Sequence, residues 1–311
     1  ERARTFAFAA RFLPPEQRDA TTVLYAFCRV IDDLADEPDD LTPAAVRERL
    51  AAWRSWVATR GAAPVPEPAA LARATLEVVT RYEVPAAYLL GLIDGIESDL
   101  GPVRVPDYLA LRRYCLRVAG TVGLAMCHVL GVRHPIALAA AAELGIAMQL
   151  TNVLRDVGGD LRRDRVYLPA DDLARFDYTA AKLFDAYARG GQPDAALKAL
   201  LAFEVKRARA HYARGLAGVW LLPAPVRPSI LMAGRLYRAI LDRIEASDYD
   251  VLRRRAATSR ATKVREAAIA VLLSRLWGEG PREEVGASME LIPSRPLEPL
   301  EMMEDLAWLG S

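Results

Sequence analysis

Apolar side chains recur every three or four positions through most of this 311-residue chain, which is the repeat of an amphipathic helix. Alanine, leucine and arginine, which all favour helices, are abundant, and strand patterns are scarce. The chain is therefore expected to be all-α. The pattern predicts helices over residues 15–36, 43–59, 69–82, 85–99, 107–131, 135–157, 193–218, 225–246 and 261–277.

Cap and turn residues indicate where these helices begin and end. Thr42 followed by Pro43 is typical of an N-cap and a first helical position. Asp107 is a candidate cap for the fifth helix. The pair Gly158-Gly159 predicts the end of the helix that starts at residue 135.

No repeat, glycine-serine linker or change of composition marks a domain boundary. Residues 1–277 are therefore predicted to form a single helical domain, and 278–311 a tail that contains proline and glutamate. No signal peptide and no uninterrupted apolar run of about 20 residues is visible. A cytoplasmic protein with no membrane span is the expectation.

Composition excludes several functions. The 41 Lys and Arg nearly balance the 40 Asp and Glu, and a net charge of +1 gives no electrostatic case for a nucleic-acid partner. The cysteines form no CxxC pair and are expected to be buried thiols of a reducing compartment; they are Cys28, Cys115 and Cys127. The histidines lack the spacing of a zinc site; they are His128, His134 and His211.

The first acidic cluster lies at the end of the 15–36 helix. Asp32 and Asp36 are four residues apart, which places two carboxylates about 5–6 Å from each other on one helical face. Negative charge is unfavourable at a helix C-terminus. A cation between the carboxylates would offset both their mutual repulsion and their unfavourable interaction with the helix dipole. Oxygen ligands of this kind suit Mg²⁺.

The second cluster follows the same spacing. Asn152, Asp156 and Asp160 are each four residues apart, and Gln149 precedes Asn152 by three. If the helix continues far enough, one face carries amide and carboxylate oxygens. Two such sets, far apart in sequence and each ending an apolar helix, could hold several Mg²⁺ ions across a cleft and chelate a diphosphate between them.

Two motifs carry a resemblance to a known family. Residues 25–33 (YAFCRVIDD) and 149–158 (QLTNVLRDVG) closely resemble the squalene/phytoene synthase family. Supporting pieces occur in the expected order at 4–6 (RTF), 13–15 (LPP), 114, 118–123 (VAGTVG), 165–169 (RVYLP) and 248–250 (DYD). The similarity covers about residues 2–265, and the tail is unmatched.

The resemblance implies an isoprenoid-synthase-type helical bundle around a central cavity, with the aspartate pairs facing each other at its mouth. The implied ligands of Mg²⁺, with Mn²⁺ as a substitute ion, are Asp32, Asp36, Asn152, Asp156 and Asp160. The implied diphosphate contacts are Arg4, Thr5, Arg29 and Arg155. Side chains implied to line the reaction site are Tyr25, Tyr114, Gln149 and Tyr249. The implied catalytic set is Tyr25, Arg29, Asp32, Asp36, Tyr114, Asp156 and Asp160.

The chain departs from the family pattern at two positions. Gly159 stands where the family usually has an acid before the last aspartate of the second motif, which puts the Asp160 end of the metal site in doubt. Ala3 stands where a serine is frequent, which removes one hydrogen bond to phosphate.

Ordinary packing accounts for several of these residues as well. Arg29 is placed to pair with Asp33 at i+4, and tyrosines are common in helical cores. Gly120 and Gly123 fit either close helix packing or a bend shaped for substrate. The run Arg253–Arg255 fits either a solvated face or a diphosphate contact.

The activity implied by the resemblance joins two prenyl diphosphates head to head. The leading hypothesis is condensation of two C20 geranylgeranyl diphosphates, through a cyclopropylcarbinyl (prephytoene) diphosphate, to phytoene for carotenoid biosynthesis, without NADPH. A sibling hypothesis applies the same chemistry to C15 farnesyl diphosphate, giving presqualene diphosphate, dehydrosqualene or squalene. A more distant one is a non-catalytic helical assembly factor, which the intact aspartates disfavour. Apolar substrate and product are compatible with peripheral membrane contact, and the oligomeric state is left open.

Overall fold

The computed structural model describes residues 13–36 and 41–276. Arg4, Thr5 and the tail 278–311 lie outside this part, and so does the side chain of Asp36. The predictions that rest on them therefore stay predictions.

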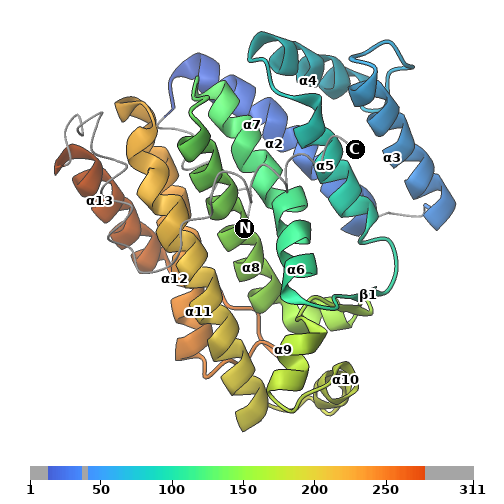
Figure 1. The fold of residues 1–311 in the computed structure, drawn as a ribbon, viewed down its shortest axis with the longest axis vertical. Coiled ribbons are helices and arrows are strands. Elements are labelled where there is room, and N and C mark those ends of the chain that lie inside the picture. The colour runs from blue at the N-terminus through green and yellow to red at the C-terminus, as the bar shows by residue number, and fades with distance from the viewer. Residues whose placement is uncertain (1–12, 37–40, 277–311) are drawn as a thin grey trace.

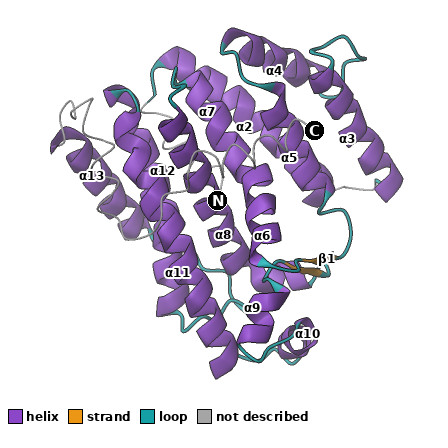
Figure 2. Ribbon diagram, in the orientation of Figure 1, coloured by secondary structure: helices purple, strands orange, loops and turns teal. Residues whose placement is uncertain are grey.

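The described part is a bundle of helices, as expected (Figures 1 and 2). Its α-helices are α2 Pro15–Asp36, α3 Pro43–Ala58, α4 Ala69–Arg81, α5 Ala86–Glu97, α6 Tyr108–Cys115, α7 Thr121–Val129, α8 Pro135–Leu161, α9 Ala170–Arg175, α10 Ala180–Ala188, α11 Ala195–Ala217, α12 Arg227–Ala246 and α13 Arg260–Leu276. Short π and 3₁₀ turns are η1 Leu116–Gly120, η2 Gly218–Leu221 and η3 Ala224–Val226. Two parallel two-residue strands, β1 Val103–Arg104 and β2 Arg165–Val166, pair in register.

Both predicted caps are confirmed. The Thr42 hydroxyl accepts from the N–H of Ala45 at 3.2 Å, and the Asp107 carboxylate accepts from the N–H of Ala110 at 2.8 Å. The helix predicted over 107–131 is instead divided by the π turn η1 into α6 and α7. The sequence analysis did not predict α9, α10 or the two strands.

The prediction that Gly158-Gly159 ends a helix is wrong, because α8 runs through both glycines to Leu161. Gly158 serves a close backbone approach instead. Its N–H donates to the Val251 carbonyl at 3.2 Å, and a Cβ there would lie 2.2 Å from the Leu252 carbonyl oxygen. The turn after α12 is thereby held against α8, and the second cluster keeps one continuous helical face.

Helix α8 lies in the middle of the bundle, where it packs against α7, η1, α11 and α12 (Figure 1). It is long and apolar enough to cross a membrane by composition alone, but 67% of its apolar window is buried inside the protein. Burial in the bundle core therefore accounts for its hydrophobicity.

Glycines set how closely the neighbours of α8 approach it. A Cβ on Gly145 would lie 2.5 Å from the Ala119 carbonyl oxygen, and one on Gly123 would lie 2.6 Å from that of Ala141. Backbone thus meets backbone where α8 passes η1 and α7. The structure therefore confirms close helix packing at Gly123.

A buried ion network attaches α9 to α11. Arg207 donates through Nη1 to Asp172 at 2.6 Å and to Glu204 at 2.7 Å. Asp172 is 5% and Glu204 2% exposed, so two carboxylates share one guanidinium away from water. Burial raises the pKa of Glu204 to about 8; Arg207 lowers it, and Asp172 raises it further. Burial beside Asp172 therefore favours the protonated form of Glu204 in the folded protein.

Replacing Gly158 by alanine should destabilise the protein by roughly 1–3 kcal/mol, because the added methyl group meets the Leu252 backbone. Gly159→Ala is the matched control. Its Cβ would have nothing nearer than the Arg162 guanidinium at 3.7 Å, so better helix propensity should stabilise by up to about 1 kcal/mol. Chemical unfolding of both variants measures this. Equal effects of the two substitutions would contradict the docking of the Val251–Leu252 turn.

Glu204→Gln should change how stability depends on pH. Because the folded protein keeps the Glu204 proton up to about pH 8 and the unfolded chain loses it above about pH 4.5, wild-type stability falls as pH rises through this window. Glutamine carries no such proton. The free energy of unfolding of the variant, relative to that of wild type, should therefore rise by up to about 1.4 kcal/mol for each pH unit in this window. Urea unfolding at several pH values tests this, with exposed Glu48→Gln as control. A difference that stays constant with pH would rule it out.

Candidate active site

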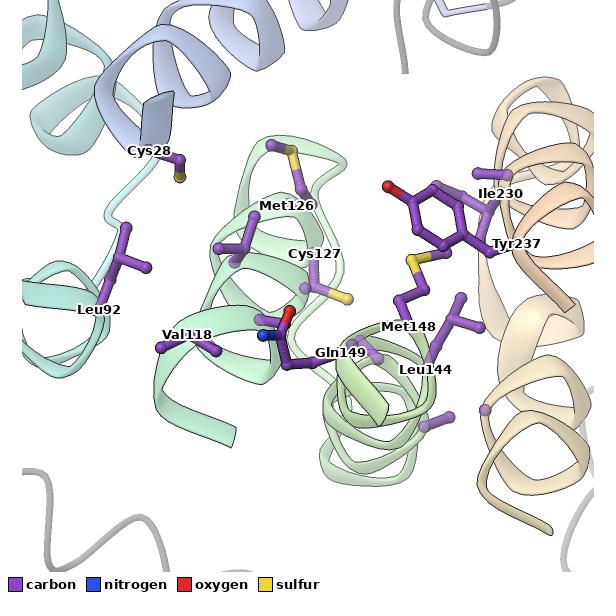
Figure 3. Close-up of a pocket in the computed structure, with 18 of the residues that line it drawn as sticks. Cys28, Leu92, Val118, Met126, Cys127, Leu144, Met148, Gln149, Ile230 and Tyr237 are labelled. Atoms are coloured by element: carbon purple, nitrogen blue, oxygen red, sulfur yellow. The ribbon is translucent and has the colours of Figure 1, made fainter. Parts of the chain in front are cut away.

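A cavity of about 310 Å³ lies inside the bundle, lined by residues of α2, α5, α6, η1, α7, α8, α11, η2 and α12. Figure 3 shows side chains pointing into it from opposite walls, with Cys28 on one side and Ile230 and Tyr237 on the other. Most of the lining is aliphatic or sulfur-containing, including Leu92, Val118, Met126, Leu144 and Met148.

The cavity follows α8 along its length. Lining residues of this helix run from Ala137 to Asn152, which is about 22 Å at 1.5 Å per residue. From Ala137 to Met148 they are apolar, whereas Gln149 and Asn152 at the other end are polar. The cavity is therefore elongated. It is apolar along most of α8 and polar at the end where Gln149 and Asn152 lie.

The polar end joins the two predicted clusters. Tyr25, Arg29 and Asp32 of α2 line the same cavity as Gln149 and Asn152 of α8. These α2 residues are four and three apart, so they share one helical face. The structure thus brings one aspartate of the first motif and two amides of the second, Asp32, Gln149 and Asn152, to a single space.

Arg29 is paired within its own helix. It donates to Asp32 at 2.9 Å and also to Asp33, the partner expected from the i+4 spacing. The Arg29 side chain is 37% exposed, so it is accessible from solvent while facing the cavity. Arg29 therefore both pairs with Asp33 and lies in the candidate site.

Asn152 brings a buried acceptor to the polar end. Its Nδ2 donates to the Gln149 Oε1 at 3.0 Å. Its Oδ1 is buried and has no hydrogen-bond partner among the described residues. A buried amide oxygen without a donor is costly in a protein, so this atom is suited to a cation or to a donor on a bound molecule.

Asp156 lies between two arginines and is not among the cavity-lining residues. Arg155 reaches both of its oxygens, at 2.9 and 2.6 Å, and Arg255 does the same, at 2.6 and 3.1 Å. Burial alone would raise the pKa of Asp156, but hydrogen bonds from these arginines lower it well below the usual range. The run at 253–255 thus contributes a contact to the second cluster.

Asp160 faces a separate small cavity that it shares with Arg165 and Tyr167. Arg165 also donates to the Ala35 carbonyl at 3.3 Å, which ties this region to the end of α2. The continuous α8 keeps Asp156 and Asp160 one turn apart. In the described part of the chain, no three His, Cys, Asp or Glu side chains gather closely enough to hold a metal ion.

Tyr249 is the predicted lining residue that the structure does not bring to the cavity. It lies on the turn after α12, at φ 58°, and packs against the core. The tyrosine of this region that lines the cavity is Tyr237, which the sequence analysis missed. Its spacing of seven from Ile230 predicts a shared helical face, but nothing in the sequence shows that this face meets a cavity.

The cavity thiols are not ionised near neutral pH. Burial, and then the charge of Asp32, raise the pKa of Cys28 to about 12, and burial raises that of Cys127 to about 12. Both stay neutral near pH 7 and act as small apolar groups.

Comparison with known proteins gives a consistent result. A family model described as squalene/phytoene synthase matches residues 1–262. The phytoene synthase of Arthrospira platensis is 36% identical over 267 residues, covering 82% of this chain and 84% of that protein. The phytoene synthase of Thermus thermophilus is 38% identical over 252 residues, covering 81% and 82%. A crystal structure of a dehydrosqualene synthase with ligand superposes with a TM-score of 0.75 and 26% identity, covering 88% of this chain and 92% of that one.

Proposed function

The chain belongs to the squalene/phytoene synthase family, and we propose that it joins two geranylgeranyl diphosphates head to head, through a cyclopropylcarbinyl diphosphate, to make phytoene for carotenoid biosynthesis. The observation that carries the proposal is the elongated apolar cavity whose polar end is lined by residues of both motifs, Asp32 of the first and Gln149 and Asn152 of the second. Relatives named phytoene synthase, 36% and 38% identical over most of the chain, support the choice of substrate.

The geometry suits an amphiphilic substrate. A diphosphate group fits the polar end formed by Arg29, Asp32 and Asn152, and prenyl chains fit the apolar body along α8. Arginine binds phosphate oxygens in a bidentate manner. Arg29 can exchange its exposed intrahelical pairing for such a contact at small cost, because exposed ion pairs contribute little to stability.

The lining protects a carbocation once diphosphate has left. Aliphatic and thioether groups exclude water, which would otherwise capture the cation. The rings of Tyr25, Tyr114 and Tyr237 line the cavity and can stabilise positive charge through their faces. The chain thus orients the two substrates and keeps the reaction dry.

We further propose that the polar end holds Mg²⁺. The donors there are oxygens, as Mg²⁺ prefers, and the buried Oδ1 of Asn152 lacks a partner among the described residues. Asp32 and Asn152 line the cavity, whereas Asp156 does not and is held by two arginines one helical turn after Asn152. When bound, the metal would supply electrostatic stabilisation of the leaving diphosphate.

Purified protein incubated with labelled C20 or C15 diphosphate, with and without NADPH, tests the substrate. With Mg²⁺ and geranylgeranyl diphosphate we expect a C40 conjugated triene and released pyrophosphate, without any effect of NADPH. Removing Mg²⁺ with a chelator should abolish both. If the protein converts farnesyl diphosphate but not geranylgeranyl diphosphate, the C20 assignment is wrong. If it converts neither, the proposed enzymatic activity is wrong.

Asp32→Asn and Asp156→Asn test the two acidic clusters. Each should lower kcat on the order of 100-fold or more, because an electrostatic contact to the leaving group is lost, while thermal unfolding stays cooperative. Exposed Asp185→Asn on α10 is the matched control and should turn over like wild type. If the folded fraction of both variants is fully active, the two aspartates have only a structural role and the prediction is wrong.

A further inference from the structure

Behind the cavity wall, one buried carboxylate accepts hydrogen bonds from two tyrosines. The Tyr114 hydroxyl donates to Asp99 Oδ2 at 2.8 Å, and the Tyr167 hydroxyl donates to Asp99 Oδ1 at 2.6 Å. Asp99 is 5% exposed. Burying a carboxylate is costly unless its oxygens are hydrogen-bonded, and here each oxygen receives a phenol.

The three residues come from separate segments of the chain. Asp99 follows α5, Tyr114 is on α6, and Tyr167 follows β2. The two rings are stacked, with centroids 5.0 Å apart and planes at 25°. Of the three, only Tyr114 lines the cavity. Asp99 and Tyr167 therefore support the cavity wall from behind.

A phenol has a single proton to donate. Burial, and then the charge of Asp99, raise the pKa of Tyr114 well above its ordinary value, so the hydroxyl keeps its proton. Because that proton is directed at Asp99, the phenol oxygen has only lone pairs left for any other group. A hydroxyl free to rotate could instead turn its positive end inward.

We propose that Asp99 is a positioning residue of the reaction: by accepting the Tyr114 proton, it fixes this ring in the cavity wall and keeps the positive end of the hydroxyl dipole directed at the carboxylate instead of at the substrate. Tyr167 holds Asp99 in place through its second oxygen. The inference rests on the proposed function, because a fixed dipole of this sign stabilises a carbocation. It also keeps the hydroxyl oriented throughout both ionisations, at no further cost of reorganisation.

A double-mutant cycle of Asp99→Asn and Tyr114→Phe tests this. Each single variant should lower kcat for C40 product roughly 10- to 100-fold, as losses of supporting contacts do, with a smaller change in KM. A larger share of ionised substrate should appear as water-captured prenyl alcohol. The double variant should fall no further than the worse single one, because Asp99 acts through the Tyr114 hydroxyl.

Tyr167→Phe, alone and with Tyr114→Phe, gives a second cycle that keeps Asp99. It should lower kcat less than Asp99→Asn does, and that loss should vanish in the Tyr114→Phe background. If Asp99→Asn does not fold, this second cycle decides alone. Wild-type turnover of the folded variants, or equal fractional losses in both backgrounds, would overturn the inference. An inactive wild-type protein would instead overturn the proposed function, and the inference with it.

Discussion

Everything in this site depends on α8 remaining one unbroken helix while its neighbours approach it at backbone distance. Gly145 and Gly123 allow η1 and α7 to meet it closely, and Gly158 lets the turn after α12 rest on it. An unbroken helix keeps residues four apart on one face. The apolar part of the cavity and its polar end are therefore lined by two stretches of the same helix, which fixes their positions relative to each other.

The carboxylates Asp32 and Asp156 of the two motifs are each paired with arginine. Asp32 is paired with Arg29, and Asp156 with Arg155 and Arg255. Such pairs contribute modestly to stability, but they place guanidinium groups beside each acidic motif. A site for diphosphate needs both signs of charge, because anionic oxygens require cations while a metal ion requires carboxylates.

The chemistry also requires a wall that excludes water and stabilises positive charge. The thiols are neutral, the aliphatic groups are inert, and Tyr114 has its proton committed to Asp99. The π turn η1 contributes to this wall, since Val118 and Ala119 line the cavity. Local irregularities of this kind are frequent at functional sites, and here one lies between Tyr114 and the close packing at Gly123.

The sequence by itself determined the helical class, the two caps at Thr42 and Asp107, and the spacing that puts each acidic set on one face. These are local properties, decided within one or two turns of chain. Only the tertiary structure decided that Gly158 continues a helix, that Tyr237 rather than Tyr249 meets the cavity, and that Asp99 joins two tyrosines. Arg255 likewise finds Asp156 across 99 residues of sequence. Such contacts depend on how distant helices pack, and no local pattern encodes which faces will meet.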